Sequence, residues 1–116
     1  MNYQHIRVEP LSTWLGAEVA GVDLAAPVAD ETFAEIRRAF GEYGVVFFRD
    51  QRLTPEQHVA FAERFAPIDI NRFFSAVLGY PMIAEVRKEP EQTRNIGGGW
   101  HTDHSYDQVP ALGSML

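Results

Sequence analysis

The sequence predicts an α+β fold with one small domain. Two observations support this prediction: two segments carry apolar side chains at helical spacing behind helix-start signals, and several short apolar runs have the composition of strands. The 116 residues, of which 46% are hydrophobic and 12% aromatic, suffice for a globular core. The expected helices cover residues 31–43 and 54–65, and the expected strands cover residues 6–9, 17–19, 45–48 and 82–86.

The composition argues against several kinds of site and partner. Because the chain has no cysteine, any metal must be held by nitrogen and oxygen ligands. The net charge of −6 and the scattered basic residues argue against a nucleic-acid partner, since binding to a phosphate backbone requires clustered Lys and Arg. The sequence shows neither an apolar run of about 18 residues nor a secretory leader, so we expect a cytoplasmic chain without a membrane span.

The first two expected strands precede the first helix. Residues 6–9 alternate apolar and charged side chains, which is typical of a half-buried strand, and Pro10 ends the run. A second short strand is expected at Ala17–Val19, followed by a loop at residues 21–27. Asp30 is then placed to cap the next helix, because its carboxylate can accept hydrogen bonds from free backbone N–H groups.

The helix expected at residues 31–43 is amphipathic, and Gly44 ends it as a C-terminal cap. Its apolar side has Phe33, Ile36, Phe40 and Tyr43, and its charged side has Glu35, Arg37, Arg38 and Glu42. The run Val45–Phe48 follows at once and is continuously β-branched and aromatic. Such a run is typical of a strand buried on both faces, so we expect it at the centre of the sheet.

A capping box with proline at the first helical position, Thr54–Gln57, starts the second helix. The helix is expected to run to about Phe65, and Pro67 closes it. Its partly inward side chains are Val59, Phe61, Ala62 and Phe65. His58 lies in this helix without a second ligand at i+4, so we interpret it, like His5, as a surface or packing histidine.

The second half of the chain is less regular. We expect an irregular aromatic stretch at residues 69–80 and a strand at Met82–Val86. Residues 87–95 are charged and are expected to form a mobile loop, which we interpret as a solvated connector in preference to a loop that contacts substrate. A turn at residues 107–110 then leads into a strand that begins at residues 112–116. Because this strand stops at its apolar residues, we expect the chain to be a fragment.

The pair His101 and Asp103 is the place where the sequence looks built for chemistry. In an extended strand, side chains two residues apart point to the same face, so both can reach a single metal ion. An imidazole nitrogen and a carboxylate oxygen are two of the three protein ligands in the 2-His-1-carboxylate site of non-haem Fe(II) enzymes. The run Gly97–Gly99 allows a sharp turn before the pair, and Trp100 supplies an apolar wall. Alone, the spacing is also compatible with an ordinary exposed or hydrogen-bonded pair.

With these segments in view, the chain resembles the N-terminal part of the TauD/TfdA family of Fe(II)- and 2-oxoglutarate-dependent dioxygenases. The resemblance covers nearly the whole chain. The segments that carry it are Gly16–Val19, Gly21–Leu24, Gly44–Arg49, Leu53–Gln57 with Phe65, and Trp100–Asp103.

The resemblance implies a double-stranded β-helix, or jelly roll, with flanking helices, of which residues 1–116 form one incomplete domain. It also implies that His101 and Asp103 hold Fe(II) together with a later histidine, and that 2-oxoglutarate chelates the iron. Oxidative decarboxylation of 2-oxoglutarate by O2 then gives succinate and CO2 while the substrate is hydroxylated. The later histidine and the arginine that pairs with 2-oxoglutarate lie beyond Leu116 in family members, so we expect the fragment alone to be inactive.

The resemblance says less about the substrate. Family members that use taurine carry a His-x-x-Tyr pair where this chain has Asn71 and Phe74, so taurine itself is not expected. We expect a small, anionic organic substrate. The candidate substrate residues are Asn71, Arg72, Phe74 and Asn95, for which ordinary loop and core roles remain alternatives. His104, next to Asp103 along a strand, should face away from the metal.

A different class of function remains open. The chain could be a non-catalytic interaction or subunit domain that retains the N-terminal half of the family. For the enzyme, the expected partners are a small-molecule substrate and O2, with no nucleic acid and no membrane, and a homo-oligomer is compatible with the sequence.

Overall fold

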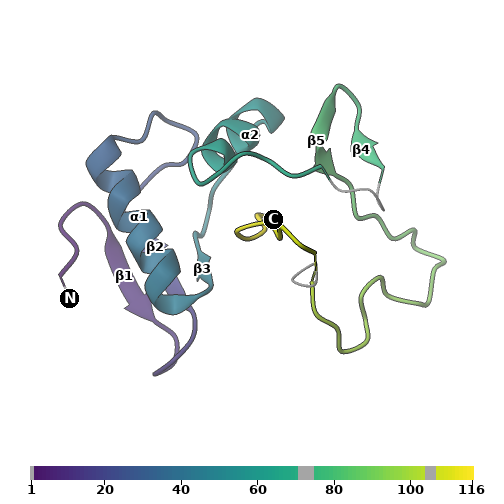
Figure 1. The fold of residues 1–116 in the computed structure, drawn as a ribbon, viewed down its shortest axis with the longest axis horizontal. Helices are drawn as coiled ribbons and strands as arrows, with labels where there is room; N and C mark the ends of the chain where they lie inside the picture. Colours follow the sequence, from purple (N-terminus) through teal and green to yellow (C-terminus); the bar gives the residue numbers. More distant parts are fainter. Residues whose placement is uncertain (1, 71–74, 104–106) are drawn as a thin grey trace. The chain divides into compact units, whose positions relative to one another are not determined.

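The computed structural model describes residues 2–70, 75–103 and 107–116. The chain divides into two compact units, one ending at His58 and one starting at Val59. The prediction of one domain stays a prediction, because compactness alone does not show whether a unit folds by itself. No helix of the described residues is long and apolar enough to cross a membrane. The elements are β1 (Arg7–Pro10), β2 (Ala17–Ala20), α1 (Asp30–Tyr43), β3 (Val46–Phe47), α2 (Pro55–Glu63), β4 (Ala76–Val77) and β5 (Tyr80–Ala84) (Figure 1).

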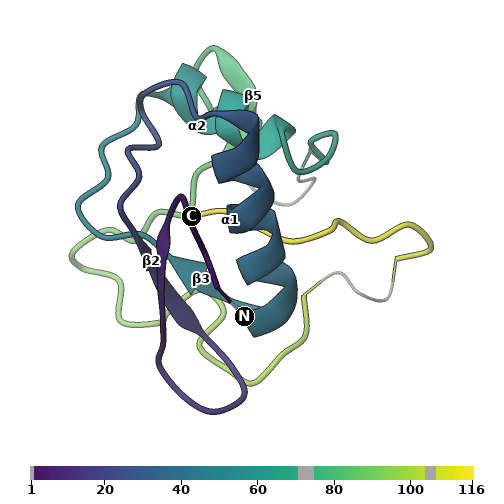
Figure 2. The ribbon, with the colours of Figure 1, turned by 90° about the vertical axis from the view of Figure 1, so that its left-hand side faces the viewer.

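The N-terminal unit is a three-stranded sheet with one helix along it. The strand order is β1-β2-β3, with β1 antiparallel to β2 and β3 parallel to β2. The parallel pair requires a crossover, since parallel strands cannot be joined by a tight hairpin. Helix α1 forms this crossover and lies along the sheet (Figure 2).

The core of the N-terminal unit forms between β2 and α1. Ala17 and Val19 of β2 are buried while Glu18 between them is half-buried, as expected where alternate strand residues face a helix. Ile36 and Ala39 of α1 are also buried. Burying a Val or Ile side chain contributes about 1.5–3 kcal/mol, so these contacts hold helix and sheet together.

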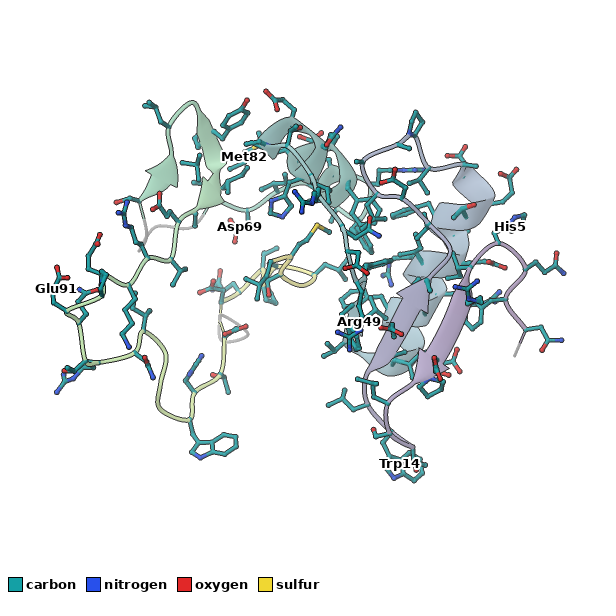
Figure 3. All side chains as sticks on the ribbon, turned by 180° about the vertical axis from the view of Figure 1, so that it is seen from behind. His5, Trp14, Arg49, Asp69, Met82 and Glu91 are labelled. Atoms are coloured by element: carbon teal, nitrogen blue, oxygen red, sulfur yellow. The ribbon has the colours of Figure 1, made fainter. Side chains whose placement is uncertain are left out.

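The expected central strand at residues 45–48 is wrong in two respects. The observed strand β3 is only Val46–Phe47, and it lies at an edge of the three-stranded sheet, where β2 is central. Val45 is exposed and both strand residues are half-buried. Its apolar run therefore does not reflect burial on both faces within the described residues. Arg49, which follows β3 and is labelled in Figure 3, also joins this part of the chain to β2 through its ion pair with Glu18.

Helix α1 confirms the predicted helix but corrects its start. Residue Ala29 is the N-cap and makes no side-chain capping bond; its carbonyl accepts a hydrogen bond from Phe33 N–H at 2.9 Å. Asp30 is therefore not the cap, but its charge lies in the first turn, where the helix dipole favours an acidic side chain. The predicted C-cap is confirmed, since Gly44 has φ 74° and its N–H donates to Phe40 C=O.

The position of Glu35 in the helix predicted that it lies on a solvated charged face, but this prediction is wrong. Its side chain is only 7% exposed. Oε1 accepts a hydrogen bond from Gln4 N–H at 2.6 Å, and Oε2 accepts from His5 N–H at 2.7 Å and Ile6 N–H at 3.2 Å. The carboxylate thus supplies acceptors for three consecutive backbone N–H groups that precede β1. Burial of these N–H groups without acceptors would be costly.

Neighbouring side chains fix the same N-terminal segment on α1. The Tyr3 hydroxyl donates to Glu42 at 2.6 Å, and the Arg38 guanidinium donates to the Asn2 carbonyl at 2.9 Å while lying over the Tyr3 ring. Partial burial raises the pKa of Tyr3, and the hydrogen bond to Glu42 adds to the increase. The segment therefore docks on the helix through polar contacts with Arg38 and Glu42 as well as with Glu35.

Helix α2 confirms the capping box. Thr54 N–H donates to the Gln57 side chain at 2.9 Å, and Gln57 N–H donates to the Thr54 hydroxyl at 3.2 Å. The helix ends at Glu63, two residues before the expected end. Of the residues expected to face inward, Phe61 is buried and the others, Val59, Ala62 and Phe65, are half-buried.

The C-terminal unit contains a hairpin that the sequence did not predict. Strand β4 lies in the stretch expected to be irregular, and it pairs with β5 across Leu78-Gly79. Gly79 has φ 81°, which a two-residue hairpin loop needs and glycine adopts freely. The strand expected at Met82–Val86 is observed as Tyr80–Ala84, two residues earlier, because the tight turn sets its start.

The prediction of a strand at residues 112–116 is wrong. These residues have neither helix nor strand structure, and Leu112 and Leu116 are exposed. Within the described residues the sheets have three and two strands. The jelly roll that the resemblance implies is therefore not seen in the part of the chain that the structure describes.

Candidate functional site

The pair His101 and Asp103 follows the glycine run and lies outside regular structure. Residues 101–103 have neither helix nor strand geometry, so the strand from which their common direction was predicted is not observed. The two side chains nevertheless approach each other, with 3.7 Å between His101 Nε2 and Asp103 Oδ1. The imidazole is 55% exposed and the carboxylate 84% exposed. Both groups are therefore reachable from solvent.

The other ring nitrogen of His101 contacts the glycine run itself. Nδ1 lies 2.8 Å from the carbonyl oxygen of Gly99. Gly97, with φ 69°, lies against the same ring, because a β-carbon placed on it would be 3.3 Å from His101 Cε1. The glycine run thus contacts the imidazole at two points as well as turning the chain.

The distance within the pair is compatible with shared coordination of one metal ion. Bonds from zinc to protein nitrogen and oxygen ligands are about 2.0–2.2 Å, so two ligand atoms of one ion lie no more than about 4.4 Å apart. The 3.7 Å separation of Nε2 and Oδ1 is within this limit. No group of three or more His, Cys, Asp or Glu side chains suited to a metal occurs among the residues with described positions. The pair therefore fits as two ligands of a larger set.

Trp100 does not form the expected apolar wall. Its indole is fully exposed, so it covers neither His101 nor Asp103 in the described structure. The physical reason is that the residues around it, 95–103, contain no strand or helix against which a large ring could pack.

The charged stretch before the pair is held by its own side chains. Arg87 forms ion pairs with Glu89 at 2.7 Å and with Glu85 at 3.8 Å. Lys88 donates a hydrogen bond to the Asn95 side chain at 2.7 Å. Asn95, a candidate substrate residue, lies two residues before Gly97. Its side chain is exposed and accepts the hydrogen bond from the Lys88 ammonium group.

Some of the predicted positions fall in segments that the structure does not describe. Asn71, Arg72, Phe74 and His104 lie outside the described residues. Among the histidines interpreted as structural, His5 takes part through its backbone in the hydrogen bonds to Glu35, and His58 is half-buried in α2.

An imidazole nitrogen and a carboxylate oxygen, the groups that approach each other here, are two of the three protein ligands that non-haem iron oxygenases use. Comparison with known proteins supports this class. The family described as "Taurine catabolism dioxygenase TauD, TfdA family" matches residues 7–116. The chain therefore belongs to the TauD/TfdA family of dioxygenases, as the sequence motifs had predicted.

Two curated relatives illustrate the family. The (S)-phenoxypropionate/alpha-ketoglutarate-dioxygenase of Sphingobium herbicidovorans is 34% identical over 114 residues, which cover 94% of this chain and 39% of that protein. The alpha-ketoglutarate-dependent 2,4-dichlorophenoxyacetate dioxygenase of Cupriavidus pinatubonensis is 29% identical over 124 residues, which cover 92% of this chain and 43% of that protein. The chain thus spans about two fifths of the length of these relatives.

A solved structure gives the same result for the fold. The crystal structure of a taurine dioxygenase from Burkholderia xenovorans aligns with a TM-score of 0.62 and 46% sequence identity. The alignment covers 67% of this chain and 28% of that one. Its TM-score and identity together support membership in the family beyond a general likeness of fold.

Proposed function

We propose that the chain contributes His101 and Asp103 as two iron ligands to a 2-oxoglutarate-dependent dioxygenase. The observation that carries the proposal is the 3.7 Å approach of Nε2 and Oδ1 at a solvent-exposed position in a member of this family. Bound Fe(II) and 2-oxoglutarate would supply the oxidation of a substrate C–H bond by O2, with release of succinate and CO2.

The two side chains have different tasks in this proposal. Asp103 brings a negative charge that compensates part of the charge of a divalent cation, and His101 brings a neutral nitrogen donor. Their exposure leaves room for further ligands, which a cofactor that binds the metal directly requires. We assign the third protein ligand and the cation that binds 2-oxoglutarate to residues other than those described.

We further propose that the substrate is a small organic anion. The two curated relatives are named for phenoxypropionate and dichlorophenoxyacetate, both of which are carboxylates. Asn71, Phe74 and Asn95 remain the candidate substrate residues, of which Asn95 lies beside the Lys88 ammonium group. The chain would act as the N-terminal part of a jelly-roll domain in the cytoplasm, and it could form a homo-oligomer.

Mn(II) binding followed by NMR tests the two ligands. Mn(II) broadens the signals of groups that it contacts even at low occupancy, so the test suits a site with only two protein donors. We expect Mn(II) to broaden the His101 imidazole signals of the 116-residue chain. His101→Ala and Asp103→Ala should each weaken Mn(II) binding by more than the roughly 10–100-fold loss typical of residues that only support a ligand.

His58→Ala is the matched control, because it removes an imidazole that lies in α2. It should leave Mn(II) binding unchanged. Equal Mn(II) affinity in the parent chain and the Asp103→Ala variant would sink the proposal. The 116-residue chain with Fe(II), 2-oxoglutarate and O2 should release no succinate above a metal-only blank, because two ligands do not assemble the reactive complex; clear succinate release would contradict this expectation.

A further inference from the structure

We propose that the glycine turn before the metal-ligand pair is a positioning device for His101, in which the Gly99 carbonyl sets the tautomer and Gly97 sets the ring position. The inference rests on the proposed role of His101 as a ligand. Two independent contacts carry it: one from the turn to the ring nitrogen that faces away from Asp103, and one to the ring edge.

The first contact fixes where the imidazole proton lies. Nδ1 of His101 is 2.8 Å from the Gly99 carbonyl oxygen. A carbonyl oxygen can only accept a hydrogen bond, so Nδ1 must carry the proton. In a neutral imidazole the other nitrogen, Nε2, then has the free lone pair, and this is the atom 3.7 Å from Asp103 Oδ1. The turn thus prepares the nitrogen that faces the carboxylate as a metal donor.

The second contact fixes where the ring lies. A β-carbon on Gly97 would be 3.3 Å from His101 Cε1 and 3.8 Å from Nε2. The first distance is closer than a comfortable carbon–carbon contact of about 3.5–4.0 Å, so the ring would have to shift away. Gly97 also has φ 69°, a conformation that residues with a side chain rarely adopt. Only glycine allows both the turn and this approach of the ring.

The three glycines of the turn are not equivalent, which separates positioning from mere flexibility. A β-carbon on Gly99 would meet nothing within 4 Å, and one on Gly98 would meet Asn95 and not the imidazole. If the run served only as a flexible linker, alanine at Gly97 and at Gly99 would have similar effects. If it positions the ring, only the change at Gly97 disturbs His101, because alanine at Gly99 retains the carbonyl.

The test uses the 116-residue chain labelled with ¹⁵N in histidine, at mildly alkaline pH. Long-range ¹H–¹⁵N correlations identify which ring nitrogen carries the proton, without any metal. We expect the parent chain and Gly99→Ala to show His101 protonated on Nδ1. Gly97→Ala should shift the His101 ring signals toward a mixture of tautomers and weaken Mn(II) binding about 10-fold or more, whereas Gly99→Ala should change Mn(II) affinity less than twofold.

Gly97→Asn adds a second variant, since asparagine tolerates positive φ better than alanine but retains a β-carbon. Loss of Mn(II) affinity in this variant supports the ring contact. A parent chain protonated on Nε2, or equal effects of Gly97→Ala and Gly99→Ala, would overturn the inference. A third outcome separates the two proposals. If the parent chain has the Nδ1–H tautomer and Gly97→Ala loses it, but the parent chain binds no Mn(II), the proposed function fails and the positioning of the ring stands.

Discussion

Two carboxylates, Glu35 and Asp103, each lie beside a histidine, and their surroundings differ sharply. Glu35 is 7% exposed and accepts hydrogen bonds from the backbone N–H groups of residues 4–6. Asp103 is 84% exposed, and its side chain approaches the His101 ring. The first carboxylate is enclosed by the fold that it stabilises, whereas the second is accessible to a ligand. Proximity to a histidine therefore does not by itself mark a candidate metal site; access from solvent distinguishes the candidate Asp103 from Glu35.

The electrostatics of Glu35 agree with a structural role. Burial acts to raise the pKa of Glu35, but hydrogen bonds from Gln4 and His5 N–H, with smaller contributions from the His5 charge and Ile6 N–H, outweigh it and leave the pKa below its ordinary value of 4.5. The charged form is thus the one that the fold favours. Charge-assisted bonds of this type are stronger than neutral ones.

The largest expected effect is loss of stability in Glu35→Ala. This change leaves three consecutive backbone donors without their acceptor and detaches the segment before β1 from α1. The free energy of unfolding should fall further than in any other single variant considered for this chain. Asp103→Ala should change the free energy of unfolding by no more than about 0.5 kcal/mol, because its side chain is on the surface. Urea unfolding followed by circular dichroism measures both.

Glu42→Ala is the control for the Glu35 variant, since it removes an exposed carboxylate of the same helix that binds only the Tyr3 hydroxyl among its described contacts. Its loss of stability should be much smaller. Equal losses in the Glu35 and Asp103 variants would remove the distinction between a structural and an accessible carboxylate.

The pH dependence of stability should reveal the same difference with a smaller effect. Because the pKa of Glu35 is lower in the folded chain than in the unfolded one, its contribution is fully present above about pH 4.5 and is lost as the pH falls through the folded pKa. The stability difference between the parent chain and Glu35→Gln should therefore be constant from pH 7 to 5 and narrow below pH 4.5. A difference that widens on acidification would contradict the assigned direction of the pKa.

Local patterns predicted the helices α1 and α2 and their end signals at Gly44 and Thr54, whereas long-range partners were missed. The capping box of Thr54 and the C-cap of Gly44 depend on atoms within four residues, and both are confirmed. The role of Glu35 depends on residues 29 to 31 positions away, which helical periodicity cannot reveal. The edge position of β3 was missed for the same reason, because an apolar run does not show which strands pair on either side.

The candidate site shows a similar limit. The spacing of His101 and Asp103 indicated a shared direction, and the structure brings the two side chains together although the expected strand is absent. The glycines were expected only to turn the chain. Their contacts with the imidazole depend on the φ angle of Gly97 and on the position of the His101 ring, neither of which can be predicted from the sequence pattern. The exposure of Trp100 was missed because a large apolar side chain favours, but does not guarantee, a packed position.

The capping box extends the comparison to side chains that serve backbone N–H groups at the surface, with losses expected to be smaller than that of Glu35→Ala. Thr54→Ala removes the acceptor of Gln57 N–H and should cost about 1 kcal/mol in the free energy of unfolding, as typical N-cap losses do. Gln57→Ala should cost more, because the Gln57 amide also donates to the Ala25 carbonyl at 3.1 Å. Gln57→Glu separates the two contributions: it retains an acceptor for Thr54 N–H and loses the donor to Ala25. Urea unfolding should rank the losses with Gln57→Ala above Thr54→Ala; the reverse order would contradict the expected contribution of the bond to Ala25.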